Sequence, residues 1–257
     1  MAVTIDLSGK GALVFGVANH RSIAASIASY LHQAGAQLTV TYQNERLKRG
    51  AAELVEGKER AAAVECDVMD EAALAAAVDT AAKTAPLAVV VHSIAFAERG
   101  DLEGDFSKTG LQGFRTALEV SAYSFVAVAR AVAPRMAEGG SIFTLTFHAA
   151  EKVYPGYNVM GVAKAALENE VRMLAYEFGP RKIRVNAISA GPLNTLAARG
   201  ISGFTGMHEV HAQRSPLRRN VTQDEVGAAA LFLASPLASG ITGETLYVDA
   251  GYHIMGV

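Results

Sequence analysis

A tyrosine and a lysine seven positions apart, Tyr157 and Lys164, stand near the start of a long alanine-rich segment, "YPGYNVMGVAKAALENEVRMLAYEF". A phenol is protonated at neutral pH and can donate a hydrogen bond to an oxygen that gains negative charge, whereas an ammonium carries a positive charge. Seven residues make almost two turns of an α-helix, at about 3.6 residues per turn, so both side chains are expected to leave the helix in nearly the same direction. The pair predicts a site in which the two groups address different parts of one ligand.

Taken alone, the pair also has an ordinary structural explanation, a packing aromatic near a helix start and a lysine whose stem lies along the protein surface. The choice depends on the elements around it. Short runs rich in Val, Ile and Leu alternate with longer helical patterns, and these runs are almost continuously apolar, which is typical of strands buried on both faces of a parallel sheet. The runs are "GALVFGV", "AQLTVTYQ", "AAAVECDV", "LAVVVHSIA", "GSIFTLTF", "KIRVNAISA" and "ETLYVDAG".

The strand and helix patterns alternate throughout the chain, which implies right-handed crossovers and one domain over residues 1–257. The predicted fold is α/β, with a single doubly wound parallel sheet of about seven strands and helices on both faces, the Rossmann type. The helical patterns lie near 21–34, 45–56, 70–83, 109–137, 154–178 and 222–234.

Two of these helices, near 109–137 and 154–178, are apolar over more of their circumference than one contact with a sheet requires. A second apolar face predicts self-association of the chain. An unusually deep core is the alternative.

The composition narrows the class of protein. The formal net charge is -2 with both signs scattered, which argues against a phosphate-backbone binder, so no nucleic acid partner is expected. The single cysteine, Cys66, excludes an intrachain disulfide. The N-terminus lacks the basic and then apolar pattern of a secretory signal, and glycine and proline interrupt the longest uncharged run, 226–243, so no membrane span is expected. A cytoplasmic protein is predicted.

The segment "MHEVH" offers His208, Glu209 and His211 as possible metal ligands. A spacing of three on a helix without a distant third ligand is weak support for zinc, so we expect surface histidines and no metal. The chain also lacks the G-x-S-x-G motif of a serine hydrolase.

The first strand runs into a helix through "GVANHRSIAASIA", the place where a parallel sheet usually binds pyrophosphate. The usual G-x-G-x-x-G is absent. Gly16 opens the turn, and Ser22 stands at the helix start, where its hydroxyl and the free amides of the first turn can meet phosphate oxygens. Ordinary helix capping by Ser22 is the alternative, since such a turn occurs in many folds.

The ends of the next three strands support a dinucleotide, because they share the same edge of the sheet. Gln43 stands where an Asp or Glu commonly reads the ribose, and its neutral amide can hydrogen-bond the adenosine half without repelling phosphate. NADH is expected over NADPH. Arg46 and Lys48 nearby are expected to be solvated rather than to bind a 2′-phosphate. The residues expected beside the adenosine half from the third and fourth strands are Asp67, Val68, Ser93 and Ile94.

These segments, in this order, resemble the enoyl-[acyl-carrier-protein] reductases of bacterial fatty acid synthesis, which belong to the short-chain dehydrogenase/reductase superfamily. The similarity covers nearly the whole chain and includes "RVNAISAGPLNT" and "ITGETLYVDAGYHIMG". Its most specific mark is the gap of six residues between Tyr157 and Lys164, where the superfamily typically has three. The resemblance implies reduction of the double bond of a trans-2-enoyl thioester by NADH.

The resemblance also implies residue roles, a partner and an assembly. The partner is the acyl carrier protein that carries the thioester, the assembly is a homotetramer, and a mobile segment near 194–212 orders over cofactor and substrate. Tyr157 and Lys164 are the expected catalytic residues. The residues expected to line the dinucleotide are Gly16, Ser22, Ile23, Gln43, Asp67, Val68, Ser93, Ile94, Lys164, Leu193 and Thr195. Those expected to shape the acyl pocket are Ala97, Phe147, Met160, Ala197, Ile201 and Phe204.

Hydride arriving at the β-carbon of an enoyl thioester places negative charge on the thioester oxygen. Tyr157 is expected to donate a hydrogen bond to that oxygen, and Lys164 to hold the ribose at the nicotinamide end. The chain departs from the family at Phe147, where most members have a second tyrosine, and at Asn194, where many have Arg or Lys. The neighbouring His148 is expected to be a satisfied or solvated side chain.

Two other functions stay open at this point. A carbonyl or imine reductase on the same scaffold would use the same phenol and cofactor, and Phe147 and Asn194 are the features that keep this reading open. A non-catalytic dinucleotide-binding protein is the other. The first would consume NADH with ketones but not with crotonyl thioesters, and the second would bind NADH without turnover.

Overall fold

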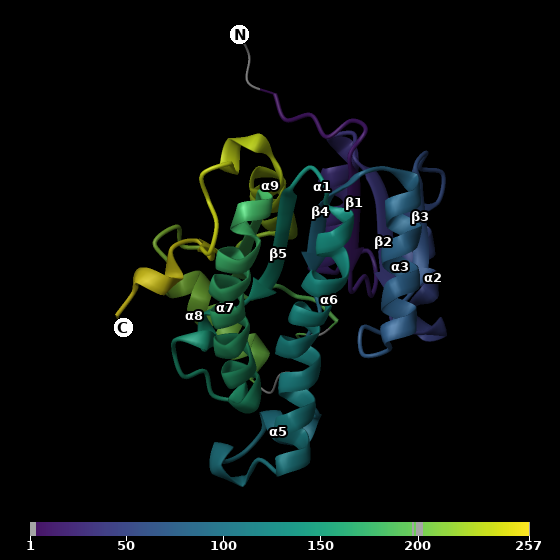
Figure 1. Cartoon of the computed structure of the whole chain (residues 1–257). Helices are drawn as coiled ribbons and strands as arrows, with labels where there is room; N and C mark the ends of the chain where they lie inside the picture. Colours follow the sequence, from purple (N-terminus) through teal and green to yellow (C-terminus); the bar gives the residue numbers. More distant parts are fainter. Residues whose placement is uncertain (1–3, 197, 199–202, 257) are drawn as a thin grey trace.

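A computed structural model of the chain describes residues 4–196, 198 and 203–256. Its centre is one sheet of seven parallel strands in the order β3-β2-β1-β4-β5-β6-β7 (Figure 1). The predicted doubly wound sheet is therefore confirmed. The strands are β1 (Gly11–Phe15), β2 (Gln37–Tyr42), β3 (Ala61–Glu65), β4 (Leu87–His92), β5 (Gly140–Thr146), β6 (Ile183–Ala190) and β7 (Thr245–Val248).

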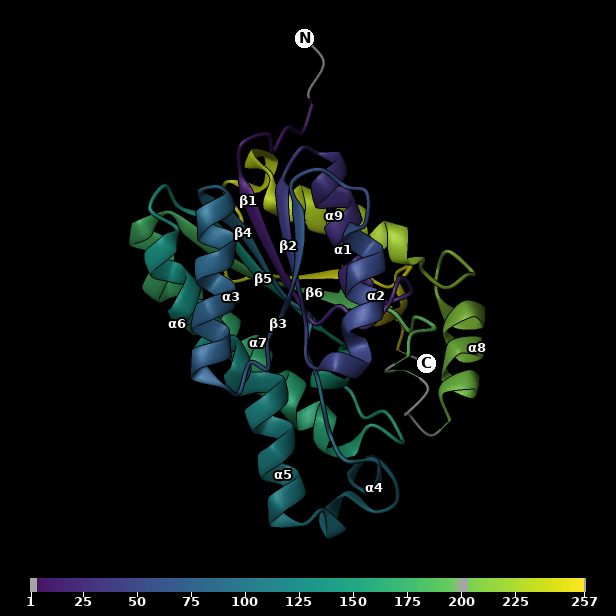
Figure 2. The same cartoon turned by 90° about the vertical axis from the view of Figure 1, so that its right-hand side faces the viewer.

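Helices cover both faces of the sheet, and each face has its own hydrophobic core (Figures 1 and 2). Strand β1 shows why its sequence is apolar throughout: Ala12 and Val14 point into one core, Leu13 and Phe15 into the other. One face carries α1 (Ile23–Gln33), α2 (Glu45–Val55) and α9 (Gln223–Ala234), and the other carries α3 (Glu71–Thr84), α6 (Ser124–Val132) and α7 (Asn158–Phe178).

The predicted helix near 109–137 is one helical run with a π-helical turn inside it. It consists of α5 (Leu111–Leu118), the π turn Glu119–Tyr123, α6 and a closing 3-10 turn, Ala133–Arg135. Within the π turn, Ser121 Oγ accepts from the amide of Phe96 and donates to its carbonyl, both at 2.9 Å. The turn thereby holds the segment that follows β4.

This helical run, Leu111–Arg135, is also apolar and long enough to cross a membrane by length and composition. In the fold it lies against other helices, and 56% of its most apolar window is buried. A core helix of a globular protein passes the same test.

Two further helices were not predicted from the sequence. They are the short α4 (Arg99–Leu102) and α8 (Phe204–Arg214), which overlaps the segment near 194–212 that is expected to be mobile. Figure 2 shows α8 standing at the side of the molecule, apart from the layers that cover the sheet. The helix predicted near 154–178 begins at Asn158 with Tyr157 as its N-cap residue, so the predicted start is a few residues too early.

Candidate active site

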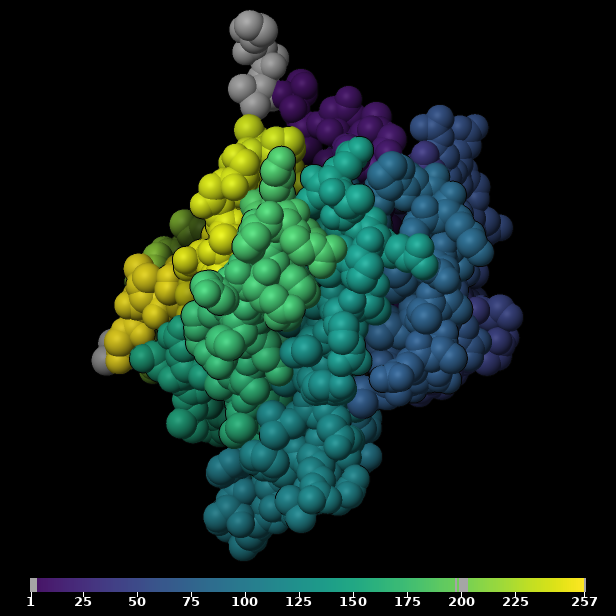
Figure 3. Space-filling view, in the orientation of Figure 1, coloured from purple at the N-terminus to yellow at the C-terminus, as the bar shows by residue number. Residues whose placement is uncertain are grey.

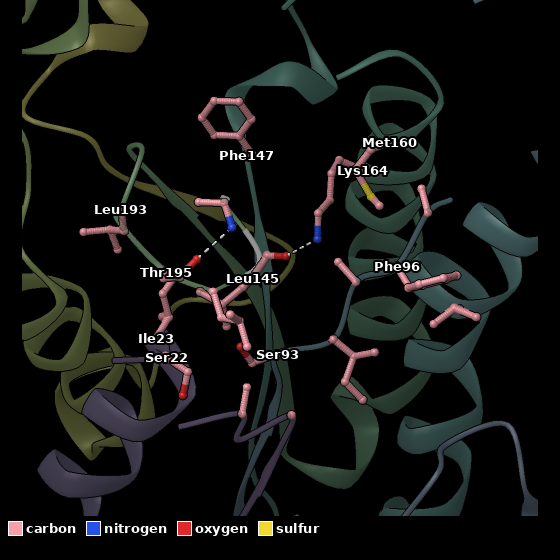
Figure 4. A pocket seen from close by; sticks show the side chains of 18 of the residues that line it. Ser22, Ile23, Ser93, Phe96, Leu145, Phe147, Met160, Lys164, Leu193 and Thr195 are labelled. Carbon is pink, nitrogen blue, oxygen red and sulfur yellow. Dashed lines mark hydrogen bonds between the residues drawn. The ribbon is translucent and has the colours of Figure 1, made fainter. Parts of the chain in front are cut away.

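A cavity of about 680 Å³ opens at the carboxyl ends of the strands. It lies where the strand order reverses, between β1 and β4, which is the usual ligand position in a doubly wound sheet. Figure 4 shows the side chains that converge on it from the sheet, from α1, from α7 and from the loop after β6. Every described residue to which the sequence assigned a catalytic, cofactor or acyl-pocket role lines this one cavity.

Gly16 directly follows β1 and lines the cavity, with a φ of 88° that favours glycine. A Cβ at this position would lie 2.1 Å from the carbonyl oxygen of Ser93, which follows β4. Only glycine therefore lets the ends of β1 and β4 approach so closely. The backbone left bare at this point is what a pyrophosphate requires in order to come near the sheet.

Ser22 is the N-cap of α1, and Ile23 is its first helical residue. The Ser22 hydroxyl accepts from the amide of Ala25 at 3.1 Å and donates to the carbonyl of Asn19 at 2.8 Å. The capping role that the sequence left as an alternative is thus present. Because the hydroxyl is already engaged, the positive end of the helix dipole is the feature of α1 that attracts an anion into the cavity.

The ends of β2 and β3 meet through a side-chain contact. Gln43 Nε2 donates to Asp67 Oδ2 at 3.3 Å, and Asp67 Oδ1 accepts from the amide of Met69 at 3.0 Å. Both side chains are held at the rim by this contact, with Val68 buried behind them. The rim offers an amide and a carboxylate, which can bind hydroxyl groups and disfavour an added phosphate.

Tyr157 lines the cavity from the turn before α7. Phe147 packs edge-on against its ring, with centroids 5.2 Å apart. Burial raises the pKa of the Tyr157 phenol above its ordinary value of 10, so the hydroxyl is protonated at neutral pH. Within the described part of the chain, no side chain or backbone group hydrogen-bonds this hydroxyl, which leaves it free to donate to a ligand.

Lys164 reaches the cavity from the second turn of α7 and is only 5% exposed. Its Nζ donates to the carbonyl oxygen of Leu145 at 2.7 Å (Figure 4). Burial lowers the pKa of the ammonium to about 8, while the neighbouring Glu168 opposes the shift. The group is therefore mostly charged at neutral pH, and it loses its charge only in mildly alkaline solution.

The remaining predicted residues lie around these two. Leu193 and Thr195 face the cavity from the loop after β6, and Thr195 Oγ1 accepts from the amide of Ala198 at 3.2 Å (Figure 4). Ala97, Phe147, Met160 and Phe204 also line the cavity. Ala197 and Ile201, also expected there, lie outside the described residues.

Behind Phe147 lies a cluster of aromatic rings and histidines that the sequence did not predict. His211 is buried rather than at the surface, so that expectation is wrong. Its ring stacks on Tyr252 at 3.6 Å, and its Nε2 lies 3.3 Å from the Tyr154 hydroxyl. His148 is satisfied as expected, with Nδ1 3.1 Å from the same hydroxyl. The cluster joins α8 to the segment before α7 and to the C-terminal residues.

Several lining residues were missed by the sequence reasoning because they come from helices far along the chain. Thr116 and Val120 belong to α5 and the π turn, and Leu102 and Met207 belong to the two unpredicted helices. No local pattern marks these positions. Phe96 was within reach, since it stands inside the quoted "HSIAFA" and directly precedes Ala97.

Comparison with known proteins shows which family the chain is similar to. The sequence profile of a family described as "Enoyl-(Acyl carrier protein) reductase" matches residues 16–253. The chain is 50% identical over 257 residues to an enoyl-[acyl-carrier-protein] reductase [NADH] of a Nostoc species, covering 98% of this chain and 100% of that protein. It is 50% identical over 254 residues to the corresponding protein of Bacillus cereus, covering 97% and 99%.

The fold is also similar to those of solved enoyl-acyl carrier protein reductase structures. The crystal structure of the Bacillus cereus enoyl-acyl carrier protein reductase with NADP+ and indole naphthyridinone has a TM-score of 0.95 and 49% identity, covering 99% of this chain and 100% of that chain. The Anaplasma phagocytophilum reductase in complex with NAD has a TM-score of 0.94 and 44% identity, covering 100% and 98%.

Proposed function

The chain belongs to the enoyl-[acyl-carrier-protein] reductase family, within the short-chain dehydrogenase/reductase superfamily, and from this membership we infer how its site works. It is an NADH-dependent oxidoreductase of fatty acid biosynthesis that reduces enoyl thioesters, with NAD(H) as cofactor. We assign Tyr157 to binding of the substrate oxygen and Lys164 to binding of the cofactor.

The residues present fit a dinucleotide. The cavity has the size expected of a cofactor site and runs along the strand ends from Gln43 to Lys164. Gly16 leaves bare backbone beside the N-terminus of α1 for the pyrophosphate. The Gln43 and Asp67 side chains suit the adenosine half, and the Lys164 ammonium suits ribose hydroxyls at the opposite end.

When bound, NADH supplies the hydride for the β-carbon of the enoyl thioester. Tyr157 donates a hydrogen bond to the thioester oxygen as negative charge grows there, so the transition state is stabilised more than the substrate. Lys164 orients the nicotinamide end and adds a positive field. Phe147 and Met160 exclude water from the reacting atoms. The observation that carries this assignment is the protonated Tyr157 hydroxyl, which has no partner among the described residues and lies in the same cavity as the buried Lys164 ammonium.

The assignment is tested by following the absorbance of NADH and NADPH with three substrates in parallel: crotonyl-coenzyme A, an enoyl thioester on acyl carrier protein, and acetoacetyl-coenzyme A. Oxidation of NADH with the two enoyl thioesters is expected, faster on acyl carrier protein. We expect kcat/KM with NADPH to be lower than kcat/KM with NADH by about 10-fold or more, because the Asp67 carboxylate at the rim repels a 2′-phosphate. Turnover of acetoacetyl-coenzyme A alone would indicate a carbonyl reductase.

Self-association is the second part of the proposal. The outer faces of α6 and α7 form one continuous side of the molecule (Figure 3), and large apolar side chains are exposed on this helical layer. They are Tyr123, Val162, Met173 and Tyr176. These side chains support a homotetramer formed through this layer, as the resemblance implies. Sedimentation velocity should give a mass near four times 26.9 kDa, and a monomer at micromolar concentration would contradict it.

The proposal also covers location and the segment over the acyl pocket. A location in the cytoplasm, with neither nucleic acid nor membrane as partner, agrees with the scattered charges and the use of acyl carrier protein thioesters. The segment near 194–212 contributes Leu196, Phe204 and Met207 to the cavity wall. These contacts support its role as the part of the chain that covers cofactor and substrate.

A further inference from the structure

The Lys164 ammonium is a buried charge with few partners. It has three N–H donors, and the described residues offer it one acceptor, the carbonyl of Leu145. Lys164 also lines the cavity. A buried ammonium tends to lose its proton unless a nearby negative charge compensates for the lost hydration. The structure must therefore supply that charge if Lys164 is to hold a ligand as a cation.

Glu168 supplies it from the next turn of the same helix. Four residues after Lys164, it stands on the same side of α7, and its side chain is buried. Its Oε1 accepts a hydrogen bond from the hydroxyl of Thr146 at 2.8 Å. Leu145 and Thr146 are consecutive residues at the end of β5, so one strand end holds the lysine through a carbonyl and the glutamate through a hydroxyl.

The other titratable and charged groups around this pair do not replace Glu168. Among the described residues, Glu168 is the side chain whose charge acts to keep Lys164 protonated. His92 faces Lys164 from the sheet, but its ring is neutral because burial lowers its pKa to about 3. Glu168 itself faces Glu151, Arg172 and Tyr247.

We propose that Glu168 is a positioning residue of this reductase: its carboxylate, held by the Thr146 hydroxyl, keeps the Lys164 ammonium charged and directed into the cavity. The proposal rests on the proposed role of Lys164 at the nicotinamide end. It differs from a purely structural role, in which the bond from Thr146 only ties α7 to β5. A structural tie would affect stability at every pH, whereas a charge that supports Lys164 changes the pH at which cofactor binding is lost.

The test is the dissociation constant of NADH between pH 6 and pH 9.5, measured by the fluorescence of the bound cofactor without substrate. In the unsubstituted protein, affinity should fall as the pH rises through about 8, where Lys164 loses its proton. Glu168→Gln removes the negative charge, so the ammonium becomes less stable and loses its proton at lower pH. The pH at which NADH affinity falls should decrease by about one unit, and the affinity at pH 6 should stay within about 2-fold of that of the unsubstituted protein.

Thr146→Val provides a second, milder route, because it removes only the hydroxyl that holds the carboxylate. It should lower the pH at which NADH affinity is lost by a smaller amount, and it replaces Glu168→Gln in the test if that variant does not fold.

In the double variant Lys164→Arg with Glu168→Gln, NADH affinity should no longer fall as the pH rises from 6 to 9.5, since a guanidinium keeps its charge. Glu59→Gln is the matched control, since it makes the same charge change at an exposed position before β3, at the opposite edge of the sheet. It should leave the curve unmoved.

Two results would overturn the proposal. One is a Glu168→Gln curve that falls at the same pH as that of the unsubstituted protein. The other is an equal loss of affinity at every pH together with a lower melting temperature, which indicates a structural tie. A failure of the proposed function looks different, because Lys164→Ala would then leave NADH affinity unchanged.

Discussion

Replacing Tyr157 with phenylalanine should lower kcat for enoyl thioester reduction by about 100-fold, while the Kd of NADH stays within about 2-fold. The substitution keeps the ring that packs against Phe147 and removes only the hydroxyl. That hydroxyl is protonated, faces the cavity and has no hydrogen-bonding partner among the described residues, so its loss leaves no buried group unsatisfied. What disappears is the donor for the thioester oxygen, an interaction made most strongly in the transition state.

The measurement is steady-state kinetics on an enoyl thioester, together with NADH binding and melting temperature. Tyr154→Phe is the matched control: it removes a phenol three residues earlier whose hydroxyl lies between His148 and His211 and which does not line the cavity. Its kcat should change by less than about 3-fold. If Tyr157→Phe raises only KM and leaves kcat intact, the phenol binds substrate without stabilising the charge that develops.

Replacing Lys164 with alanine should have the opposite signature, a Kd for NADH raised by about 10- to 100-fold. A hydrogen bond to a charged group contributes about 1.5 to 3 kcal/mol, and tenfold in affinity corresponds to about 1.4 kcal/mol. The Leu145 carbonyl also loses its partner. The rate of hydride transfer at saturating NADH should fall less than in Tyr157→Phe, because the donor to the substrate remains.

Isothermal titration of NADH into the two proteins gives the Kd directly. Lys152→Ala is the control, since it removes an exposed lysine near the same helix. Its Kd should match that of the unsubstituted chain. If Lys164→Ala binds NADH normally and loses only kcat, the lysine acts in proton transfer, and the division of roles between phenol and ammonium is wrong.

The sequence predicts the site best where its residues stand at the ends of strands. A strand that is apolar throughout must be buried on both faces, and parallel strands present their carboxyl ends at one edge. The pattern therefore predicts the sheet, and it predicts that Gly16, Gln43, Asp67 and Ser93 surround one crevice. The structure brings them together at a cavity, with Gln43 in contact with Asp67. Their roles with the cofactor stay predictions.

The sequence reasoning failed where position depends on packing between distant segments. Helical periodicity started the helix near residue 154, whereas it begins at Asn158 with Tyr157 as its N-cap. Periodicity also missed the π turn, whose Ser121 is held by a backbone segment 25 residues away. His211 looked like a surface residue because nothing near it in the chain shows that Tyr252 will cover its ring.

By itself, the sequence determined the parallel sheet, the strand ends that share one edge and the residue types that a dinucleotide and an enolate require, because these follow from short patterns of burial and from chemistry. The tertiary structure decided which groups are free, which are engaged and which are charged. The Ser22 hydroxyl is used in capping, and the Tyr157 hydroxyl has no hydrogen-bonding partner among the described residues. Burial lowers the pKa of Lys164, and Glu168 opposes that shift. Those properties depend on distances across the fold and on lost hydration, which side chains acquire only when the chain has folded.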